Sequence, residues 1–408
     1  MKNYLQTNKN KNKMKKTITI ITALILSIGA NAQTETWTPL TSGTTTFLLG
    51  VSAVNSSICY VCGYSGLIRK TTDGGVTWVA QTSTTTSNLS SIFFTDVNNG
   101  VAVGDNGALV RTTNGGSTWT SIPLTTAGLR CVYFYDLMTG YIVGGLASSG
   151  TIYKTTDGGA SWTIQTNSAT SVIYGIKFTS ATDGYFVDYA GEIFITTNGG
   201  TTWTALTSGT TTILSSIDFM NSTNGIATGR NGLILKTTTS GASWTTITSG
   251  TTDGLSDVKF VNSTTGFIVG YNISTFVGSI LKTTDGGNTW AISYPGTSSL
   301  IRASFASPNC GYVVGENGTI LKYTSTVGIA EESQESGISI YPNPTNGLFT
   351  VVLPTDKAEI NVTDILGQIL KTQATQKTTN LQLDNNGVYI VYVTTKQGTI
   401  ARKLIVNR

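Results

Sequence analysis

The sequence predicts an all-β protein: a seven-bladed β-propeller of four-stranded antiparallel blades, closed by the N-terminal strand, and then a small Ig-like β-sandwich. An octapeptide rich in threonine and glycine recurs six times, with 41 to 46 residues between its closing tryptophans. That period is typical of blade arrays rather than of helical solenoids. The octapeptides begin at Thr71, Thr112, Thr155, Thr196, Thr237 and Thr283, and they end at Trp78, Trp119, Trp162, Trp203, Trp244 and Trp290.

One repeat contains four short β-rich runs. In the second copy these are LSSIFF (residues 89–94), VAVG (101–104), ALVRTT (108–113) and STWTSI (117–122). Turns rich in glycine, asparagine and aspartate separate them, which is the pattern of a four-stranded antiparallel meander. Each repeat therefore predicts one blade.

The blade number follows from the first run of each repeat, which predicts the inner strand. It occurs seven times, although there are only six octapeptides. These runs begin at Leu49, Leu89, Leu129, Ile173, Leu214, Leu255 and Leu300, and five residues later stand Val54, Phe94, Phe134, Phe178, Phe219, Phe260 and Phe305. The seventh tryptophan, Trp37, has no inner strand before it, so residues 34–40 are predicted to form the outer strand of blade seven. Such closure leaves no large open sheet edge.

The octapeptide resembles the Asp-box, S/T-x-D-x-G-x-T-W, of sialidase-like propellers. The whole unit, with its VGxxGxIxKTTDGGxTW phrase, resembles the photosystem II assembly factor propellers over residues 34–325. An aspartate or asparagine in such a turn accepts hydrogen bonds from the amides of its own turn. The residues expected in this structural role are Asp73, Asn114, Asp157, Asn198 and Asp285, whereas Thr239 departs from the pattern.

Calcium binding by the ring of boxes is the alternative function for these residues. Each box offers one hard oxygen ligand, whereas calcium takes six or more, so no metal and no cofactor are predicted. The tryptophan is expected to pack between blades, with its N–H seeking a partner.

The first 32 residues are predicted to be a secretion signal peptide. Six lysines without an acidic residue precede a short apolar run, and Ala30-Asn31-Ala32 supplies small residues for cleavage between Ala32 and Gln33. Without this leader the chain has 19 basic and 21 acidic residues, a net charge of −2, which gives no support for a nucleic-acid partner. No other apolar run has membrane length, so no transmembrane segment is expected in the mature chain.

The C-terminal part has a different pattern. Residues 326–337 are polar and contain EESQES, which predicts a linker, and residues 338–408 alternate apolar and polar positions between NP, NG and NN turns, which predicts a small sandwich. Several of its phrases resemble the type A sorting domain of the type IX secretion system of the Bacteroidota. They are Tyr341-Pro342-Asn343-Pro344, the Gly347 turn, Asp364-Ile365-Leu366-Gly367, Gly387-Val388-Tyr389 and Arg402-Lys403-Leu404-Ile405-Val406.

This resemblance implies that the type IX secretion machinery is a partner and that the protein is secreted or attached to the cell surface. In that family the tail is commonly cleaved. An ordinary adhesive Ig-like module is the alternative interpretation of the tail. A role beside an inner-membrane complex, as an assembly factor, is not expected for a chain with such a tail.

The four cysteines do not predict a disulfide framework. Cys59 and Cys62 are three residues apart in a strand, so their side chains face opposite ways. Cys310 belongs to the blade beside that of Cys59, and a pair between these two remains open. The other interpretation is that all four cysteines, with Cys131, are buried or idle thiols.

No catalytic set is evident. The chain has no histidine, which excludes the usual general base and every Ser-His-Asp arrangement. The enzymatic alternative is a sialidase-like glycoside hydrolase, because Asp-boxes occur in such enzymes; it needs two carboxylates at a defined separation or an arginine cluster. Arg130 and Arg302 lie at offsets of one and two residues in their inner strands, so they are expected to point to opposite faces. The prediction is a protein that is not an enzyme.

The best place for a binding site is the turn between the second and third strands of each blade, on the side away from the octapeptides. These turns differ from blade to blade, whereas the surrounding positions repeat. The predicted ligand-binding residues are Tyr64, Asp105, Tyr189, Arg230, Tyr271 and Glu316, with Gly145 at the matching place and Asn106, Asn231, Asn272 and Asn317 beside them. Aromatic faces with amide donors suit an extracellular glycan or a protein partner. The alternative is that turns simply tolerate diversity.

Overall fold

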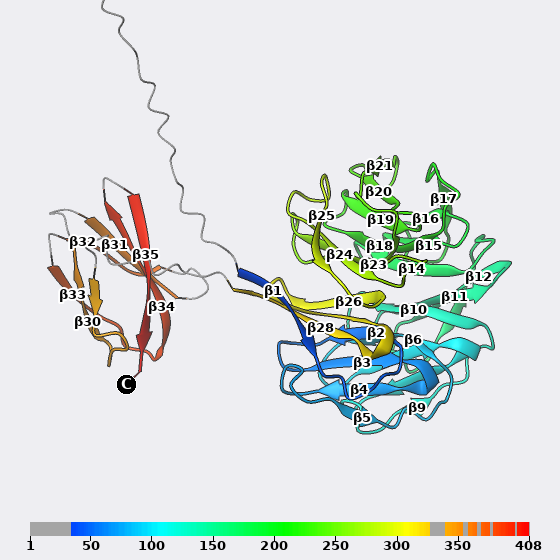
Figure 1. Ribbon diagram of the computed structural model, residues 1–408, viewed down its shortest axis with the longest axis horizontal. Coiled ribbons are helices and arrows are strands. Elements are labelled where there is room, and N and C mark those ends of the chain that lie inside the picture. Colours follow the sequence, from blue (N-terminus) through cyan, green and yellow to red (C-terminus); the bar gives the residue numbers. More distant parts are fainter. Residues whose placement is uncertain are drawn as a thin grey trace, which may run out of the picture. The chain divides into compact units, whose positions relative to one another are not determined.

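The computed structural model describes residues 34–326, 339–353, 358–364, 369–375, 378–395 and 398–407. The predicted signal peptide with its cleavage site, nearly all of the predicted linker, and Ile365, Leu366 and Gly367 of one sorting phrase lie outside the described residues. Residues Thr34–Thr326 form one compact unit, and the C-terminal strands belong to another (Figure 1). None of the helices in the described part is long and apolar enough to cross a membrane.

The first unit contains seven four-stranded antiparallel sheets, which confirms the predicted blades. Blade one contains β2 (Leu48–Ala53), β3 (Cys59–Gly63), β4 (Ile68–Thr71) and β5 (Val79–Gln81); blade two contains β6 (Leu89–Phe94), β7 (Gly100–Gly104), β8 (Leu109–Thr112) and β9 (Thr120–Ser121). Blade three contains β10 (Gly128–Phe134), β11 (Gly140–Leu146), β12 (Ser149–Thr155) and β13 (Thr163–Gln165); blade four contains β14 (Ile173–Phe178), β15 (Gly184–Asp188), β16 (Ile193–Thr196) and β17 (Thr204–Leu206). Blade five contains β18 (Leu214–Phe219), β19 (Gly225–Gly229), β20 (Ile234–Thr237) and β21 (Thr245–Ile247); blade six contains β22 (Gly254–Phe260), β23 (Gly266–Tyr271), β24 (Gly278–Thr283) and β25 (Ala291–Pro295).

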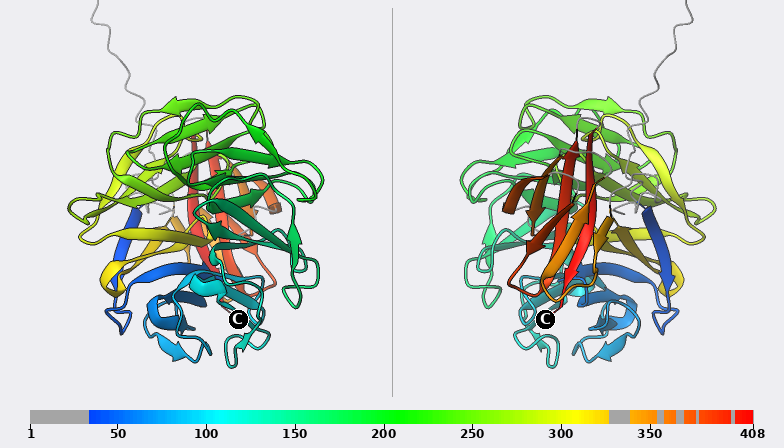
Figure 2. Two further views of the ribbon diagram at one scale, coloured as in Figure 1. Left: turned by 90° about the vertical axis from the view of Figure 1, so that its right-hand side faces the viewer. Right: turned by 90° about the vertical axis from the view of Figure 1, so that its left-hand side faces the viewer.

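Blade seven joins the two ends of the propeller, as predicted. It contains β26 (Leu300–Ser307), β27 (Cys310–Gly315), β28 (Ile320–Thr326) and, as its outer strand, β1 (Thr34–Leu40). Strand β1 pairs antiparallel with β28 along its whole length. In Figure 2 the colours run in chain order around the ring, and the blue strand β1 lies beside the yellow strands of blade seven.

Hydrogen bonds between inner strands hold neighbouring blades together around the ring. The Phe94 amide donates to Ser52 Oγ of blade one (3.0 Å), and the Phe260 amide donates to Asp218 Oδ2 of blade five (2.7 Å). The Ala53 amide of blade one donates to Ser304 Oγ of blade seven (3.0 Å), so the same device spans the closure. Because an inner strand has one edge without a strand partner, these side chains satisfy amides that a sheet would otherwise leave unpaired.

A phenylalanine near the end of each inner strand explains a repeated glycine. A Cβ atom on Gly100 would lie 2.5 Å from the Phe94 ring, and the same conflict recurs in blades three to seven. The Phe94 ring stacks on Tyr60 of blade one, with 3.6 Å between ring centroids, and Trp119 contacts it edge-on at 5.9 Å. The aromatic residues that repeat in the sequence therefore form the contact between blades.

Blade one departs from this rule in a compensated way. Ala53 occupies the phenylalanine position, and its cross-strand partner is Cys59 rather than glycine. Alanine is smaller than the phenylalanine of the other blades, and cysteine is larger than their glycine, so the two changes compensate. This pairing gives Cys59 a structural role that the sequence alone did not reveal. The predicted start of this inner strand at Leu49, with Val54 five residues later, is wrong by one residue, because the ladder pairs Leu48 with Gly63. Two adjacent leucines offered two registers, and only the cross-strand pairing distinguishes them.

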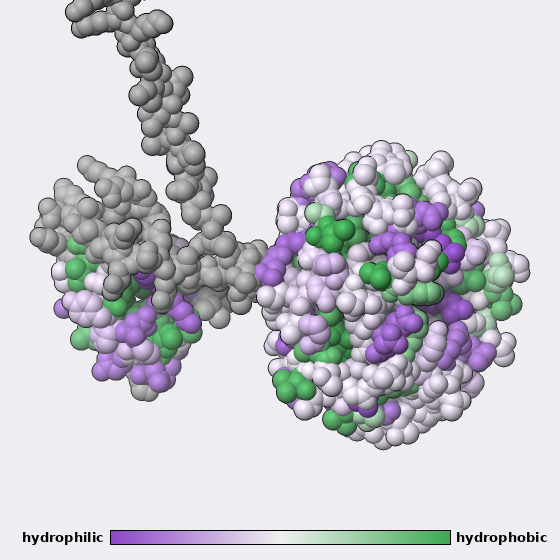
Figure 3. All heavy atoms as spheres, in the orientation of Figure 1, coloured by the Kyte–Doolittle hydropathy of each residue, from purple (hydrophilic) through white to green (hydrophobic). Residues whose placement is uncertain are grey.

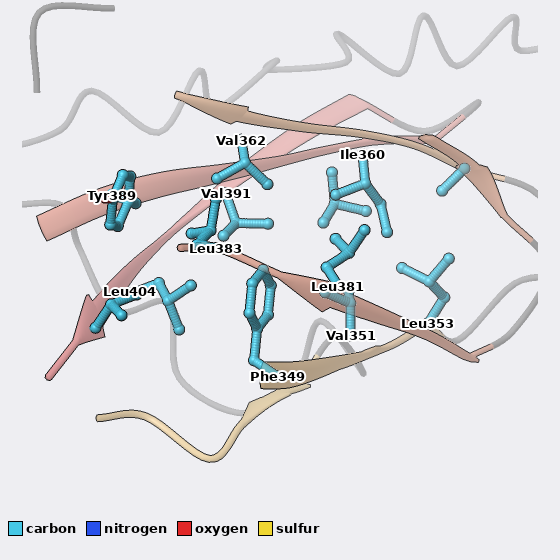
Figure 4. Close-up of a cluster of buried hydrophobic side chains, with 13 residues drawn as sticks. Phe349, Val351, Leu353, Ile360, Val362, Leu381, Leu383, Tyr389, Val391 and Leu404 are labelled. Atoms are coloured by element: carbon cyan, nitrogen blue, oxygen red, sulfur yellow. The ribbon is translucent and has the colours of Figure 1, made fainter. Parts of the chain in front are cut away.

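The second unit is a small β-sandwich. One sheet contains β29 (Ser339–Tyr341), β30 (Leu348–Val352) and β33 (Thr378–Gln382); the other contains β32 (Ile369–Thr375), β31 (Ala358–Thr363), β34 (Gly387–Thr395) and β35 (Gly398–Val406). Phe349 and Leu381 from the first sheet pack against Ile360 and Val391 from the second (Figure 4). Alternate residues of each strand supply this core, as the apolar–polar alternation predicts.

The two ends of the sandwich sequence meet in space. Asn343 Nδ2 donates to the Lys403 carbonyl (2.7 Å), and the Ile405 amide donates to Asn343 Oδ1 (2.9 Å). The Thr345 amide donates to the Ile405 carbonyl (2.8 Å). The YPNP phrase and the basic-apolar ending, which are far apart in the sequence, therefore form one structural element.

Candidate functional site

The Asp-box face of the propeller carries the turns between third and fourth strands. In the first box, Asp73 Oδ1 accepts a hydrogen bond from the Thr77 amide (2.9 Å), and Asp73 Oδ2 accepts one from Thr77 Oγ1 (2.6 Å). Thr71 Oγ1 also donates to Asp73 Oδ1 (2.8 Å). These bonds, the one from the Thr77 hydroxyl first, hold the pKa of Asp73 well below its ordinary value.

The other boxes repeat this geometry. The hydrogen bond from Ser161 lowers the pKa of Asp157 to about 2, and the one from Thr289 lowers the pKa of Asp285 to about 2. Asn114, Asn198 and Thr239 each accept a bond at 3.0 Å from the amide four residues later. The side-chain oxygens of the boxes thus accept hydrogen bonds from their own turns. No group of three or more potential metal ligands occurs among the described residues.

Basic side chains link five of the six boxes to the preceding blade, and the box of blade five instead accepts a bond from the Tyr185 hydroxyl at the Ser240 carbonyl. Lys70 Nζ donates to the Gly115 carbonyl in the box of blade two (2.8 Å), and Lys322 Nζ of blade seven donates to the Gly74 carbonyl in the box of blade one (2.7 Å). Blade seven has no box, and there Lys282 of blade six forms an ion pair with Glu35 of β1 instead. The repeated residues of this face are therefore used in holding the ring together.

The opposite face, which we call the turn face, carries the turns between second and third strands. Three of them are short 3₁₀ turns: η1 (Tyr64–Gly66), η2 (Asp105–Gly107) and η3 (Glu316–Gly318). The central residues Ser65, Asn106, Asn231 and Asn317 have φ between 55° and 57°, a left-handed conformation that asparagine tolerates well.

The predicted binding residues of five blades occupy one equivalent position on this face. The backbone amide of each residue donates to the carbonyl of the residue just before the inner strand of the same blade, at 2.9 to 3.1 Å. The backbone is therefore fixed, whereas the side chain varies from blade to blade. These residues are Tyr64, Asp105, Tyr189, Arg230 and Glu316. Tyr271 and Gly145 differ, because both lie within strands and pair with partners on either side. The longer strands of blades three and six displace the turn.

Aromatic pairs recur on the turn face, and sequence reasoning found only one member of each. Tyr64 lies 5.3 Å from Phe47, Tyr189 lies 6.2 Å from Tyr174, and Tyr271 lies 6.4 Å from Phe276, measured between ring centroids. The missed partners lie next to the first residue of an inner strand or in the enlarged turn of blade six. Their position beside predicted site residues was the available signal.

The tyrosine pair of blade four lies in the field of two arginines. The charges of Arg130 from blade three and Arg230 from blade five both act on Tyr174, opposing the burial that raises the pKa of its hydroxyl. Arg230 is exposed, and its side chain has no ion-pair or hydrogen-bond partner in the described residues. It borders an open hollow of about 690 Å³ on blade five. We call Arg130, Tyr174, Tyr189 and Arg230 the arginine–tyrosine cluster.

The acidic residues predicted for the site are engaged within the protein. Asp105 Oδ1 lies 2.8 Å from Arg130 Nη1, and Asn88 Nδ2 donates to Asp105 Oδ2 (3.1 Å). Glu316 Oε2 accepts a hydrogen bond from Ser299 Oγ (3.1 Å). These carboxylates are held in place, whereas Tyr189 and Arg230 are exposed.

The inner strands bring together charged residues that the sequence analysis separated. Arg302 Nη2 lies 3.5 Å from the Arg130 carbonyl, although the two belong to blades seven and three. This contact is made by the Arg130 backbone, whereas the Arg130 side chain pairs with Asp105, so the expectation that the two side chains point to opposite faces stays a prediction. A break in the ladder register between Leu129 and Cys131 leaves Arg130 unpaired, so simple alternation does not apply there.

Two buried aspartates of the inner strands are paired with basic residues. Asp218 lies 2.9 Å from Lys177 Nζ, and Asp257 lies 2.9 Å from Lys259 Nζ and 3.7 Å from Arg302 Nη1. Burial alone would raise the pKa of Asp257, but these cations hold it below its ordinary value. A carboxylate held ionised in this way cannot donate a proton to a leaving group, which glycoside hydrolysis needs.

Asp188 is an exception among the buried carboxyls. It replaces the glycine that pairs with the first leucine of the inner strand in the other six blades. Its Oδ1 accepts bonds from the Ala190 (3.0 Å) and Glu192 (2.8 Å) amides. Its Oδ2 is buried without a hydrogen-bond partner among the described residues. Burial chiefly, with the nearby Glu192, raises the pKa of Asp188 to about 6.

All four cysteines are free thiols, and burial raises the pKa values of Cys59, Cys62 and Cys310. A thiol whose pKa is raised forms little nucleophilic thiolate at neutral pH. These three cysteines therefore fit a packing role and not a reactive site.

Fold and turns together define an Asp-box β-propeller joined to a sorting domain. A family model described as Photosynthesis system II assembly factor YCF48 matches residues 29–175 and 164–252, and the chain belongs to that family. A second model, described as the secretion system C-terminal sorting domain, matches residues 339–407. The expected resemblances are both confirmed. No curated protein matches the sequence.

Solved structures show the same propeller fold. "YCF48 bound to D1 peptide" is 22% identical with a TM-score of 0.60, and the match covers 71% of this chain and 97% of that one. YCF48 from Cyanidioschyzon merolae is 20% identical with a TM-score of 0.58, covering 71% and 98%. The WD40 propeller of Doa1 is 12% identical with a TM-score of 0.58, covering 71% and 97%. The type IX sorting domain implies export, with secretion or attachment at the cell surface.

Proposed function

We propose that this protein is a binding module without catalytic activity that holds a segment of an extracellular partner protein on its turn face. The arginine–tyrosine cluster carries the proposal. Tyr189 and Arg230 are exposed, come from neighbouring blades and are positioned by backbone bonds that do not depend on their side chains. Tyrosine and arginine are the residues that most often dominate protein-binding surfaces.

A family relative adds support, because its structure is described as bound to a peptide. We infer that a propeller of this family can present a peptide-binding surface, with a different partner here because the sorting domain directs this chain out of the cell. A glycan partner is the other candidate that the aromatic pairs allow. Hydrolysis of a glycan is not favoured, because Asp218 and Asp257 are locked in ion pairs.

The binding experiment uses the full chain and an array of overlapping 15-residue peptides from proteins of the bacterial cell surface. We expect Tyr189→Ala and Arg230→Ala each to weaken binding about tenfold, the usual effect of losing one anchor residue. Val76→Ala is the control, because Val76 is also exposed (77%, against 47% for Tyr189) but lies on the Asp-box face. Failure of the folded protein to bind any peptide, or equal losses for all three variants, would contradict the proposal.

Export is the second part of the proposal. We infer cleavage of a signal peptide between Ala32 and Gln33, in a bacterium of the Bacteroidota that has the type IX machinery. Removing residues 338–408 should leave the propeller in the periplasm, which immunoblots of cell fractions and culture medium would show. Normal delivery of the truncated chain to the surface would overturn this assignment.

A further inference from the structure

Blade seven contains a cleft of about 640 Å³ at a place where blade five has the hollow beside Arg230, which is of similar volume, about 690 Å³, but more open. In both blades one wall is the turn between second and third strands, with Asn317 in blade seven and Asn231 in blade five. Another wall is the segment that leaves the outer strand. The two sites are thus equivalent positions in the propeller repeat, and their difference is informative.

A short crossover gives the cleft its additional wall. The outer strand β25 of blade six continues to Pro295, where it pairs with Ser279, so only residues 296–299 connect it to the inner strand of blade seven. The corresponding connection into blade five spans residues 207–213. The short path places Tyr294 and Thr297 against the cleft, whereas only Thr212 reaches the hollow of blade five.

The lining of the cleft is polar without being charged. None of the residues that line it is acidic or basic. Leu40 and Leu300 contribute apolar surface, Tyr294 presents a half-buried ring, and Asn317 and Thr297 contribute exposed polar groups. The Asn317 amide and the Thr297 hydroxyl make no hydrogen bond within the part of the chain that the structure describes.

We propose that this cleft binds a neutral saccharide. A sugar ring offers an apolar C–H face to an aromatic ring and hydroxyl groups that both donate and accept hydrogen bonds. The Tyr294 ring matches the first property, and the Asn317 amide, which can donate and accept, matches the second. A peptide terminus, a charged side chain or an anionic sugar would lose hydration without gaining an ionic partner here.

The propeller surface seen in one view has no large apolar patch (Figure 3). In the view of Figure 3, hydrophobic side chains form only small, separate patches on the propeller surface. Glu316, next to Asn317, is not part of the lining, since its carboxylate accepts a bond from Ser299. The site is distinct from the arginine–tyrosine cluster, so either proposal can fail without the other.

The test measures binding of the full chain by isothermal titration calorimetry. The probes are four neutral series (cello-, laminari-, xylo- and manno-oligosaccharides) and two anionic ones (oligogalacturonate and alginate oligomers). We expect at least one neutral series to bind and the anionic series to bind more weakly. Asn317→Gly keeps the left-handed backbone, because glycine adopts this φ freely, and removes only the amide. It should weaken binding about tenfold, and Tyr294→Ala by at least as much.

Asn231→Gly is the matched control, because Asn231 has the same backbone conformation at the equivalent place in blade five. It should leave the affinity unchanged within about twofold. Thermal unfolding of each variant checks that the fold is kept. Absence of binding by all neutral series, stronger binding of an anionic series, or equal affinity of the folded Asn317→Gly protein and the wild type would overturn the proposal.

Discussion

The two faces of the propeller differ in what their polar side chains bind. On the Asp-box face, Asp73 and its equivalents accept bonds from their own turns, and basic residues such as Lys70 and Lys322 reach the next blade. On the turn face, bonds between backbone amides and carbonyls hold the turns in place. Side chains such as Tyr189 and Arg230 are not needed for this and are exposed. Repetition therefore marks residues that hold the ring together, whereas the varied positions include both engaged carboxylates, Asp105 and Glu316, and exposed side chains such as Tyr189 and Arg230.

The largest expected effect concerns the contact between blades. Phe94→Ala should lower the free energy of unfolding by about 3–5 kcal/mol, and Gly100→Cys by about 1–3 kcal/mol, because its Cβ would lie 2.5 Å from the Phe94 ring. The double variant reproduces the Ala53–Cys59 pair of blade one. The double variant should lose less free energy of unfolding than the sum of the losses of the two single variants, by about 1 kcal/mol or more. Urea denaturation measures all three losses. Strict additivity would contradict the compensation seen in blade one.

The same substitution on each face tests the comparison directly. Lys322→Met removes a charged hydrogen bond to the Gly74 carbonyl across the ring closure and should cost about 2 kcal/mol. Arg230→Met should change stability by less than about 0.5 kcal/mol, because the side chain has no partner in the described residues. Denaturation curves of both variants give the values. Similar losses for the two would show that the turn face also stabilises the ring.

Asp188 provides an exception on the turn face. Its folded pKa of about 6 exceeds the ordinary value of 3.8, so its contribution to stability is present below about pH 4 and is lost as the pH rises through about 6. Asp188→Asn keeps Oδ1 as the acceptor for the Ala190 and Glu192 amides and carries no charge. At pH 7 it should be more stable than the wild type by up to about 3 kcal/mol, a gain that largely disappears at pH 4. Melting temperatures across this pH range measure the difference, and a constant difference would contradict the raised pKa.

The smallest expected effect lies within one box. Asp157→Ala removes the acceptor for the Ser161 amide and hydroxyl and should cost about 1 kcal/mol. Thr239→Asp restores the usual residue in blade five and should gain about 0.5 kcal/mol. Added calcium should not shift the melting temperature of either variant or of the wild type. A calcium-dependent shift that Asp157→Ala removes would revive the metal-binding interpretation.

Much of the fold followed from the sequence, because each blade repeats a local pattern of strands and turns. The solitary Trp37 and seven inner strands predicted closure by β1, and the structure confirms it. The register of blade one failed, since Leu48 and Leu49 are equally apolar and their cross-strand partners decide. The approach of the Arg302 side chain to the Arg130 carbonyl had no signal in the sequence, because it joins blades seven and three.

The sequence of each repeat determined the strands and turns of one blade, because turn residues and apolar alternation act over a few neighbouring residues. The number of repeats determined the number of blades. Tertiary structure decided what lies between blades. The match of Ala53 with Cys59, the ion pair of Arg130 with Asp105 and the uncharged cleft beside Tyr294 all join residues from different strands or blades. Such contacts depend on how far each strand extends and where a crossover begins, and hydrogen bonding across the sheet sets both.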